Sequence, residues 1–102
     1  MAKQELRVSS STKPNSAAGA IAGYAADGHT VTVVAIGTRA VSQMMKAATI
    51  ATGLAIMRGW RLLYHPTFAD EEVDDRSGTI TAIRLHVHAS RVGDSLEEGS
   101  GG

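Results

Sequence analysis

The sequence predicts a single domain of mixed α/β structure, which belongs to the α+β class. We expect a two-layer sandwich with both helices on one face of a four-stranded mixed sheet. Its 102 residues suffice for one hydrophobic core. Two apolar strand patterns are each followed by an alanine-rich helical pattern, which is typical of parallel strands joined by right-handed crossovers. Two more strand patterns then follow without a helix between them, which indicates a hairpin. The expected order is β-α-β-α-β-β.

The first strand and the loop after it are short. Leu6 and Val8 alternate with polar residues, which predicts a strand with one buried face. The segment from Ser9 to Asn15 has the composition of a loop, and its hydroxyl and amide side chains suit a helix start. We expect Thr12 or Asn15 to cap the helix that follows.

The first helix is predicted over Asn15–Ala26 and consists almost entirely of small residues. Gly28 is expected to end it, because glycine adopts the left-handed conformation that helix C-termini favour. Gly19 and Gly23 each cost about 1 kcal/mol relative to alanine inside a helix. We therefore expect them to allow close approach to the sheet or to another helix.

The second strand and second helix follow each other without a spacer. His29–Ile36 ends in a β-branched, apolar run that fits a strand buried on both faces. Gly37 permits a tight turn, and Thr38 is expected to cap the helix Thr38–Met57. Alanine, methionine and leucine form its apolar stripe at helical spacing.

The last two strands are predicted at Trp60–Tyr64, continuing irregularly to Phe68, and at Thr79–Ser90. In the latter, one face is expected to be apolar and the other polar. The apolar face would carry Ile83, Leu85, Val87 and Ala89, and the polar face Arg84, His86, His88 and Ser90. Ile80 and Ala82 are out of phase with this stripe, which indicates either a bulge or a second buried face.

Composition restricts the class of protein. No cysteine is present, which excludes a disulfide framework and a thiolate metal site. No apolar run approaches the roughly twenty residues of a membrane helix, and no signal peptide is recognisable, so a cytoplasmic location is expected. Residues 1–92 are predicted to form the domain, and residues 93–102, rich in glycine, serine and acid, a flexible tail.

Charge is distributed unevenly along a chain whose formal net charge is zero. Residues 1–69 carry seven basic and two acidic side chains, whereas five acids lie between Asp70 and Asp75. A basic body is compatible with an anionic partner, but the acidic segment would repel phosphates.

The two strand-to-helix turns are the best candidate site. Parallel neighbouring strands would place both turns at one sheet edge, where helix N–H groups and mobile cations are suited to phosphate contacts. The candidate nucleic-acid-binding residues are Lys13, Asn15, Gly37, Thr38, Arg39, Gln43 and Lys46. The alternative is that these residues are ordinary caps and the solvated face of an amphipathic helix.

Metal and catalytic sites are not predicted. His86 and His88 share a strand face, but no third ligand can be placed, and the acidic segment lacks calcium-loop spacing. The chain has no cysteine nucleophile, no Gly-x-Ser-x-Gly and no phosphate-binding glycine loop. We therefore expect no enzyme activity, no cofactor and no small-molecule substrate.

Several segments together resemble the stage V sporulation protein S family of bacteria. They are Ser11–Gly23, Val33–Ala48, His65–Asp74 and Thr81–Leu85, and the resemblance covers roughly Leu6 to Ala89. The family is similar in fold to the Alba group of small nucleic-acid-binding proteins, and the predicted element order is that of the Alba-like fold. The resemblance implies a role in bacterial sporulation or a related developmental programme.

Two functions follow from the residues and the resemblance. The first is binding of DNA or RNA through phosphate-backbone contacts, which the basic body and the fold favour. The second is protein–protein assembly or regulation without nucleic acid, which the neutral net charge and the acidic segment favour. A bare sheet face and the Gly19/Gly23 surface predict a homodimer or homotetramer in either case.

Overall fold

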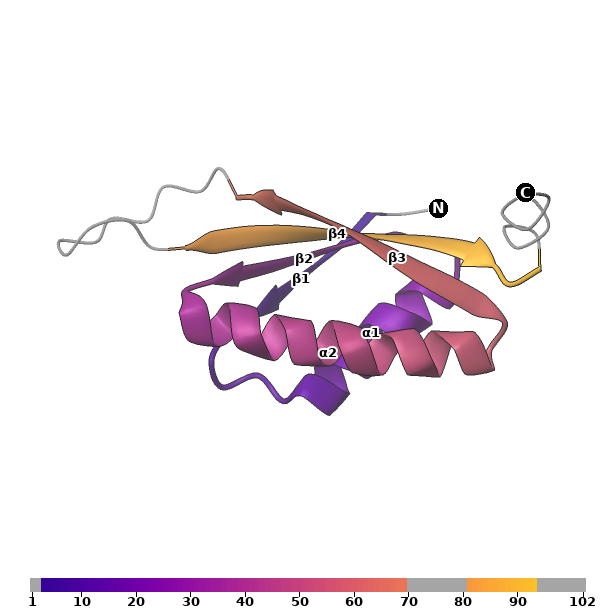
Figure 1. The fold of residues 1–102 in the computed structure, drawn as a ribbon, viewed down its shortest axis with the longest axis horizontal. Helices are drawn as coiled ribbons and strands as arrows, with labels where there is room; N and C mark the ends of the chain where they lie inside the picture. The colour runs from indigo at the N-terminus through magenta and orange to yellow at the C-terminus, as the bar shows by residue number, and fades with distance from the viewer. Residues whose placement is uncertain (1–2, 70–80, 94–102) are drawn as a thin grey trace, which may run out of the picture.

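The structure of the chain, a computed structural model, describes residues 3–69 and 81–93. Its elements are β1 (Lys3–Val8), α1 (Pro14–Ala26), β2 (Thr30–Ile36), α2 (Thr38–Met57), β3 (Trp60–Phe68) and β4 (Ala82–Arg91). The strands form one sheet, and both helices lie on the same face of it (Figure 1). The predicted two-layer sandwich is confirmed. The acidic segment 70–75 and the predicted tail beyond residue 93 lie outside the described residues.

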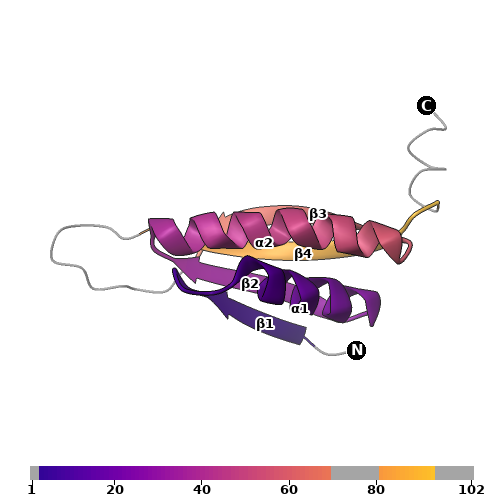
Figure 2. The same ribbon diagram turned by 90° about the horizontal axis from the view of Figure 1, so that it is seen from below.

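The strand order is β1-β2-β4-β3. β1 and β2 are parallel, with Val8 opposite Ala35 where both strands end. β4 lies between β2 and β3 and is antiparallel to both. Because both parallel strands end at one edge of the sheet, α1 and α2 both begin there and run side by side (Figure 2).

The core between the two layers is built mainly from small side chains. Val31, Val33 and Ala35 of β2 are at most 1% exposed on the helix-facing side. The buried helix residues are Ala18, Ile21, Ala22, Ala25, Ala40, Met44, Ala47, Ala48, Ala51 and Ala55. Alanine loses no side-chain entropy on burial and lets a helix approach the sheet closely. The two narrow helices therefore lie close to the sheet, and Ile21 and Met44 are the largest side chains that they bury fully.

Neither helix has the side-chain cap predicted for it. Lys13 is the residue that caps α1 and Pro14 its first helical residue, while the Thr12 hydroxyl accepts a 2.8 Å hydrogen bond from the Ser9 N–H instead. Proline suits this first position because it needs no N–H acceptor there. The Thr12 and Asn15 predictions were therefore wrong: the hydroxyl-rich loop satisfies its own backbone rather than the helix start.

Gly37, rather than Thr38, is the capping residue of α2. Its backbone has φ 97° and ψ 152°, a conformation that is essentially restricted to glycine. The Gly37 N–H donates to the Thr81 carbonyl at 2.6 Å, and its own carbonyl accepts from the Val41 N–H at 3.0 Å. This glycine is required because the chain turns directly from β2 into α2 while still pairing with the segment before β4.

The end of α1 follows the sequence prediction, but its interior glycines do not. Asp27 is the C-terminal capping residue and Gly28 follows with φ 85°, while the His29 N–H donates to the Tyr24 carbonyl at 3.0 Å. A Cβ added at Gly19 or Gly23 would have no atom within 4 Å. The expected close approach at these two glycines was wrong, because both lie on the outer side of α1.

β3 and β4 pair without a break from Trp60 opposite Arg91 to Phe68 opposite Ile83. β3 is therefore regular to its end, and Pro66 is tolerated because β3 is an edge strand. Ala82 is 6% exposed and lies on the face away from the helices. It is out of phase with the apolar stripe of β4 because this second face is also buried there, and not because of a bulge. Ala89, predicted to belong to the apolar stripe, is exposed instead.

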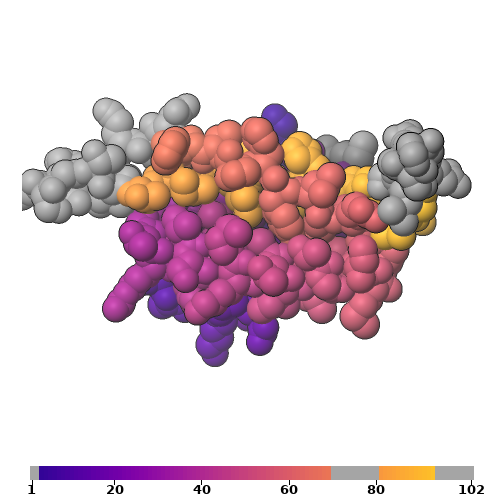
Figure 3. Space-filling model, viewed as in Figure 1, coloured from indigo at the N-terminus to yellow at the C-terminus, as the bar shows by residue number. Residues whose placement is uncertain are grey.

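The Tyr64 hydroxyl attaches β3 to α2. It donates to the Ala48 carbonyl at 2.8 Å and lies 2.9 Å from the Thr52 hydroxyl. Side chains of α2 and β3 are in direct contact along this flank (Figure 3). Burial raises the pKa of Tyr64 above 10.0, and the hydrogen bond with Thr52 opposes this shift.

α2 is long and apolar enough to cross a membrane, judged by length and composition alone. Its buried alanines and Met44 pack against the sheet, and the core helices of soluble proteins meet the same criterion.

Substitution of Gly37 by alanine is expected to destabilise the fold, whereas substitution of Gly19 by alanine should stabilise it. The first forces a Cβ into a glycine-only conformation, at a cost of about 1–3 kcal/mol. The second removes a helix-interior glycine without a clash, for a gain of about 1 kcal/mol. Urea unfolding of both variants at low protein concentration measures the change in the free energy of unfolding that each substitution causes. A Gly37→Ala variant as stable as the wild type would contradict the geometry of the turn.

Tyr64→Phe is expected to lower the free energy of unfolding by about 1 kcal/mol at neutral pH, because it removes the hydroxyl shared with α2. The raised pKa means that the native state holds its proton more tightly than the unfolded state. Wild-type stability should therefore fall as pH rises above about 10, the pKa of unfolded tyrosine. Chemical unfolding at several alkaline pH values should show that the free energy of unfolding declines less with pH in the variant than in the wild type.

Candidate nucleic-acid interface

The two strand-to-helix turns are joined at the edge of the sheet where β1 and β2 end. Gln43, one turn into α2, donates from its side-chain Nε2 to the Thr12 carbonyl at 2.9 Å. This bond connects α2 to the loop before α1, across 31 positions of sequence. The expectation that the two turns share one edge is confirmed, and we call this surface the helix-start edge.

The loop at this edge is held by its own hydroxyl groups. The Ser9 hydroxyl lies 3.1 Å from that of Ser11 and 3.2 Å from that of Thr12, and it accepts from the Ser11 N–H at 3.2 Å. The Thr12 N–H donates to the Ser9 carbonyl at 3.2 Å. The loop is therefore a compact turn that presents Lys13 at a defined position.

Three cations surround the helix starts. Lys13 precedes α1, Arg39 is the second residue of α2, and Lys46 lies two turns further along α2; all three are exposed. Thr38, the first residue of α2, is exposed as well. The first N–H groups of a helix have no acceptor within the helix, so each helix start adds partial positive charge to the edge.

A shallow groove of about 750 Å³ lies between the first turn of α1 and the segment 42–50 of α2. Asn15 of α1 and Lys46 of α2 both line it, and its lining is mostly apolar. The remaining lining residues are Pro14, Ser42, Met45, Thr49 and Ile50. The structure thus brings Asn15 and Lys46 together, an association that sequence spacing alone did not predict.

Gln43 differs from the other candidate residues. It is half-buried, and its amide nitrogen is already bonded to the Thr12 carbonyl. Arg39, Gln43 and Lys46 follow one another at helical spacing and so share one side of α2, but only the two cations are exposed. Gln43 positions the loop that carries Lys13, and this role depends on a contact between distant segments.

The described residues are strongly basic. They contain nine lysine and arginine side chains and only Glu5 and Asp27 as acids, an excess of seven positive charges. The other eight acids of the chain fall in segments 70–80 and 94–102. The folded body thus has the charge that an anionic partner requires.

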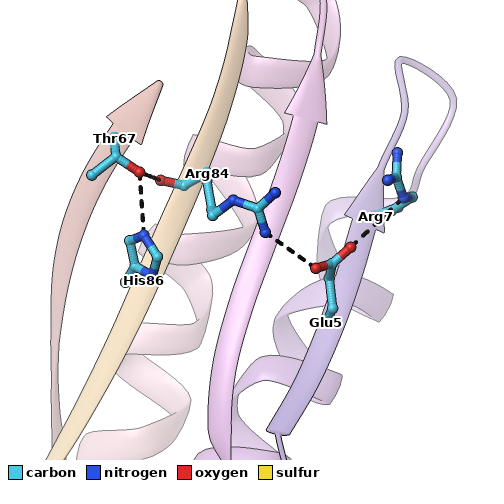
Figure 4. Close-up of polar contacts among 5 residues, drawn as sticks. All are labelled: Glu5, Arg7, Thr67, Arg84 and His86. Atoms are coloured by element: carbon cyan, nitrogen blue, oxygen red, sulfur yellow. Dashed lines mark hydrogen bonds and ion pairs between the residues drawn. The ribbon is translucent and has the colours of Figure 1, made fainter. Parts of the chain in front are cut away.

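The sheet face away from the helices carries a second polar cluster (Figure 4). Arg84 of β4 reaches across β2 to Glu5 of β1, with its Nη1 3.2 Å from Oε1, and Arg7 Nε lies 3.8 Å from Oε2. The bridging arginine helps to explain why Val34 of β2 is only 1% exposed on a face without helices. The sequence predicted a polar face that carries Arg84 but gave no sign of Glu5, because the partner of Glu5 depends on strand order.

The histidines of this face do not form a metal site among the described residues. His86 Nε2 lies 3.2 Å from the Thr67 hydroxyl, and its ring is 6.0 Å from that of His65. Across residues 3–69 and 81–93, no three histidine or carboxylate side chains are grouped so as to hold a metal ion. His88, two residues after His86 on β4, is exposed and lies opposite Leu63.

The family of the chain is established by comparison with known protein families. The model of the family described as stage V sporulation protein S matches residues 4–90, which include both helices and all four strands almost entirely. The chain belongs to the stage V sporulation protein S family. The resemblance drawn from the sequence is thereby confirmed.

Membership of this family makes the chain a sporulation-related protein. The match spans the helix-start edge, the groove and the polar sheet face together. All the candidate residues from Lys13 to Lys46 therefore lie inside the part shared with the stage V sporulation protein S family.

Replacing Gln43 by alanine is expected to loosen the loop before α1. The variant loses the bond to the Thr12 carbonyl, so amide hydrogen exchange over residues 9–13 should accelerate and the free energy of unfolding should fall by about 1 kcal/mol. Ser42→Ala, one residue away and exposed, is the matched control and should change neither quantity. Equal exchange in both variants would remove the positioning role assigned to Gln43.

Proposed function

We propose that this member of the stage V sporulation protein S family binds nucleic acid through the helix-start edge, as a cytoplasmic binding module without enzyme activity. One observation carries the proposal: Lys13, Arg39 and Lys46 are exposed around two helix starts at one edge of the sheet. Lysine and arginine side chains together with helix N-termini are the groups that contact phosphate backbones.

Recognition by this edge is expected to be independent of base sequence. The three cations and the helix starts offer charge and N–H groups, whereas the exposed part of the edge carries no aromatic side chain among the described residues on which bases could stack. If three phosphates of a duplex are neutralised, affinity should fall roughly 40-fold between about 50 and 200 mM salt. Asn15, which lines the groove beside Lys46, could add a hydrogen bond to a phosphate or sugar.

A second function, protein assembly without nucleic acid, is supported by a different surface. The outer faces of α1 and of the second half of α2 carry no charged side chain: none lies between Lys13 and Asp27, or between Lys46 and Arg58. Charge-poor, exposed helix faces are typical of surfaces that contact protein. The two functions are compatible, and nucleic-acid titration distinguishes an assembly protein from a binder.

Replacing Arg39 and Lys46 by glutamate is expected to weaken binding of DNA and RNA more than about tenfold, because two phosphate contacts become repulsions. The measurement is fluorescence anisotropy with labelled single- and double-stranded DNA and RNA at about 50 and 200 mM salt. The matched control replaces Lys3 and Arg91, which lie at the opposite sheet edge, by glutamate. It changes the net charge equally and should retain most of the affinity.

Equal losses in the two double variants would mean that net charge, and not the helix-start edge, determines binding. Absence of binding by the wild type at low salt would reject the nucleic-acid function and leave assembly as the function of the chain. Circular dichroism of each variant verifies that the fold is retained.

A further inference from the structure

Three of the four histidines of the chain lie on the open face of the sheet, the face that the helices leave uncovered. His65 of β3 is directly opposite His86 of β4, and His88 follows two residues later on β4. Side chains two residues apart on a strand share a face, and Arg84 of β4 reaches Glu5 on the face away from the helices (Figure 4). His65 and His88 are exposed, and His86 is half-buried.

An arginine and an exposed apolar side chain complete this surface. Arg61 and Leu63 precede His65 on β3 at the same two-residue spacing, opposite Ser90 and His88. Leu63 is 58% exposed. Within the described part of the chain Arg61 has no carboxylate partner, and its buried Nε has no hydrogen-bond acceptor. We call the surface of Arg61, Leu63 and the three histidines the histidine face.

The charges around the histidine face are almost all positive. Arg84 precedes His86 on the same side of β4, and Lys3 and Arg7 lie further away on β1, beyond β2. Glu5 is the only acid on this side of the sheet among the described residues, and Arg84 and Arg7 already engage it. β2 contributes no charged side chain. The histidine face therefore has the charge that an anionic partner requires.

Acidification adds positive charge to this face, because imidazole changes its charge between about pH 5 and 8. The rings of His65 and His86 are centred 6.0 Å apart, so protonation of both places two like charges side by side. An anion bound beside them offsets that repulsion. Proton uptake and anion binding then reinforce each other, and the affinity for an anion rises as the pH falls.

We propose that the histidine face binds single-stranded nucleic acid and that protonation of its histidines strengthens this binding. Arginine and protonated imidazole suit phosphate groups, while the exposed imidazole rings and Leu63 offer flat or apolar surface to unpaired bases. A four-stranded sheet presents such side chains in one plane, the arrangement in which RNA-recognition modules hold two or three bases. A duplex keeps its bases stacked inside, so only the phosphate contacts remain available to it.

The histidine face is separate from the helix-start edge. Arg39 and Lys46 belong to the helical layer, whereas the histidine face lies on the other side of the sheet (Figure 1). Lysine, arginine and carboxylate side chains keep their charge between about pH 6 and 8. Binding at the helix-start edge should therefore hardly change over this range, and the pH dependence identifies which surface holds the nucleic acid.

Fluorescence anisotropy of the full chain with labelled oligothymidylate at about pH 8 and about pH 6 tests the proposal, because thymine carries no charge at either pH. The wild type should bind at least about fivefold more tightly at the lower pH. The triple variant His65→Gln/His86→Gln/His88→Gln should lose this increase. His29→Gln, which removes the one histidine outside this face, is the matched control and should retain it.

Because His86 is half-buried, the double variant His65→Gln/His88→Gln guards against loss of the fold and should lose most of the increase. Equal affinity of the wild type at both pH values, or an increase that survives the triple substitution, would overturn the proposal. So would an equal increase with a duplex of the same length, or competition by polyglutamate of equal charge that matches the oligonucleotide.

The two nucleic-acid surfaces fail separately in this experiment. Arg39→Glu/Lys46→Glu should weaken binding at about pH 8 and still show the increase at about pH 6. Wild-type binding that is confined to the lower pH would reject the helix-start edge and support the histidine face. Binding that is equal at both pH values and lost in Arg39→Glu/Lys46→Glu would do the reverse, and no binding at either pH would reject both.

Discussion

The parallel pairing of β1 with β2 is the constraint on which the rest of this structure depends. With Val8 opposite Ala35, both strands end at one edge, and both helices must begin there and run back over the same face. The helix starts, their partial charges and the side chain that links them are consequences of that register. Gln43 reaches the Thr12 carbonyl only because the two turns are neighbours.

Small side chains determine how closely the helices approach the sheet and which residues lie on the outer side of α1. Alanine on the buried faces of both helices lets them lie close to the sheet and to each other, so the helix pair is narrow. The same composition leaves α1 without a charged residue on its outer side. Because α1 consists of small residues and contains two interior glycines, its stability depends on packing against the rest of the domain. The space outside Gly19 and Gly23 is empty, so this side of α1 is available to another molecule.

The candidate site could be predicted from sequence in part. Parallel βα units are recognisable from periodicity, so the shared edge and the exposure of Lys13, Arg39 and Lys46 were foreseeable. Gln43 was misjudged because helical spacing defines a face but not what packs against it. Glu5 was missed because an ion pair that crosses β2 requires the strand order β1-β2-β4, and hydrophobic patterns do not encode which strand becomes the neighbour.

The sequence by itself determined the elements, their order and the family, because these depend on local periodicity, glycine and proline positions and motifs that are contiguous in the chain. The tertiary structure decided which residue caps each helix, where Gly19 and Gly23 lie, and which charges find partners. Gly37, for example, caps α2 and also donates its N–H to the carbonyl of Thr81, a residue far along the chain. These outcomes depend on contacts between segments far apart in sequence, whose free energies no local pattern records.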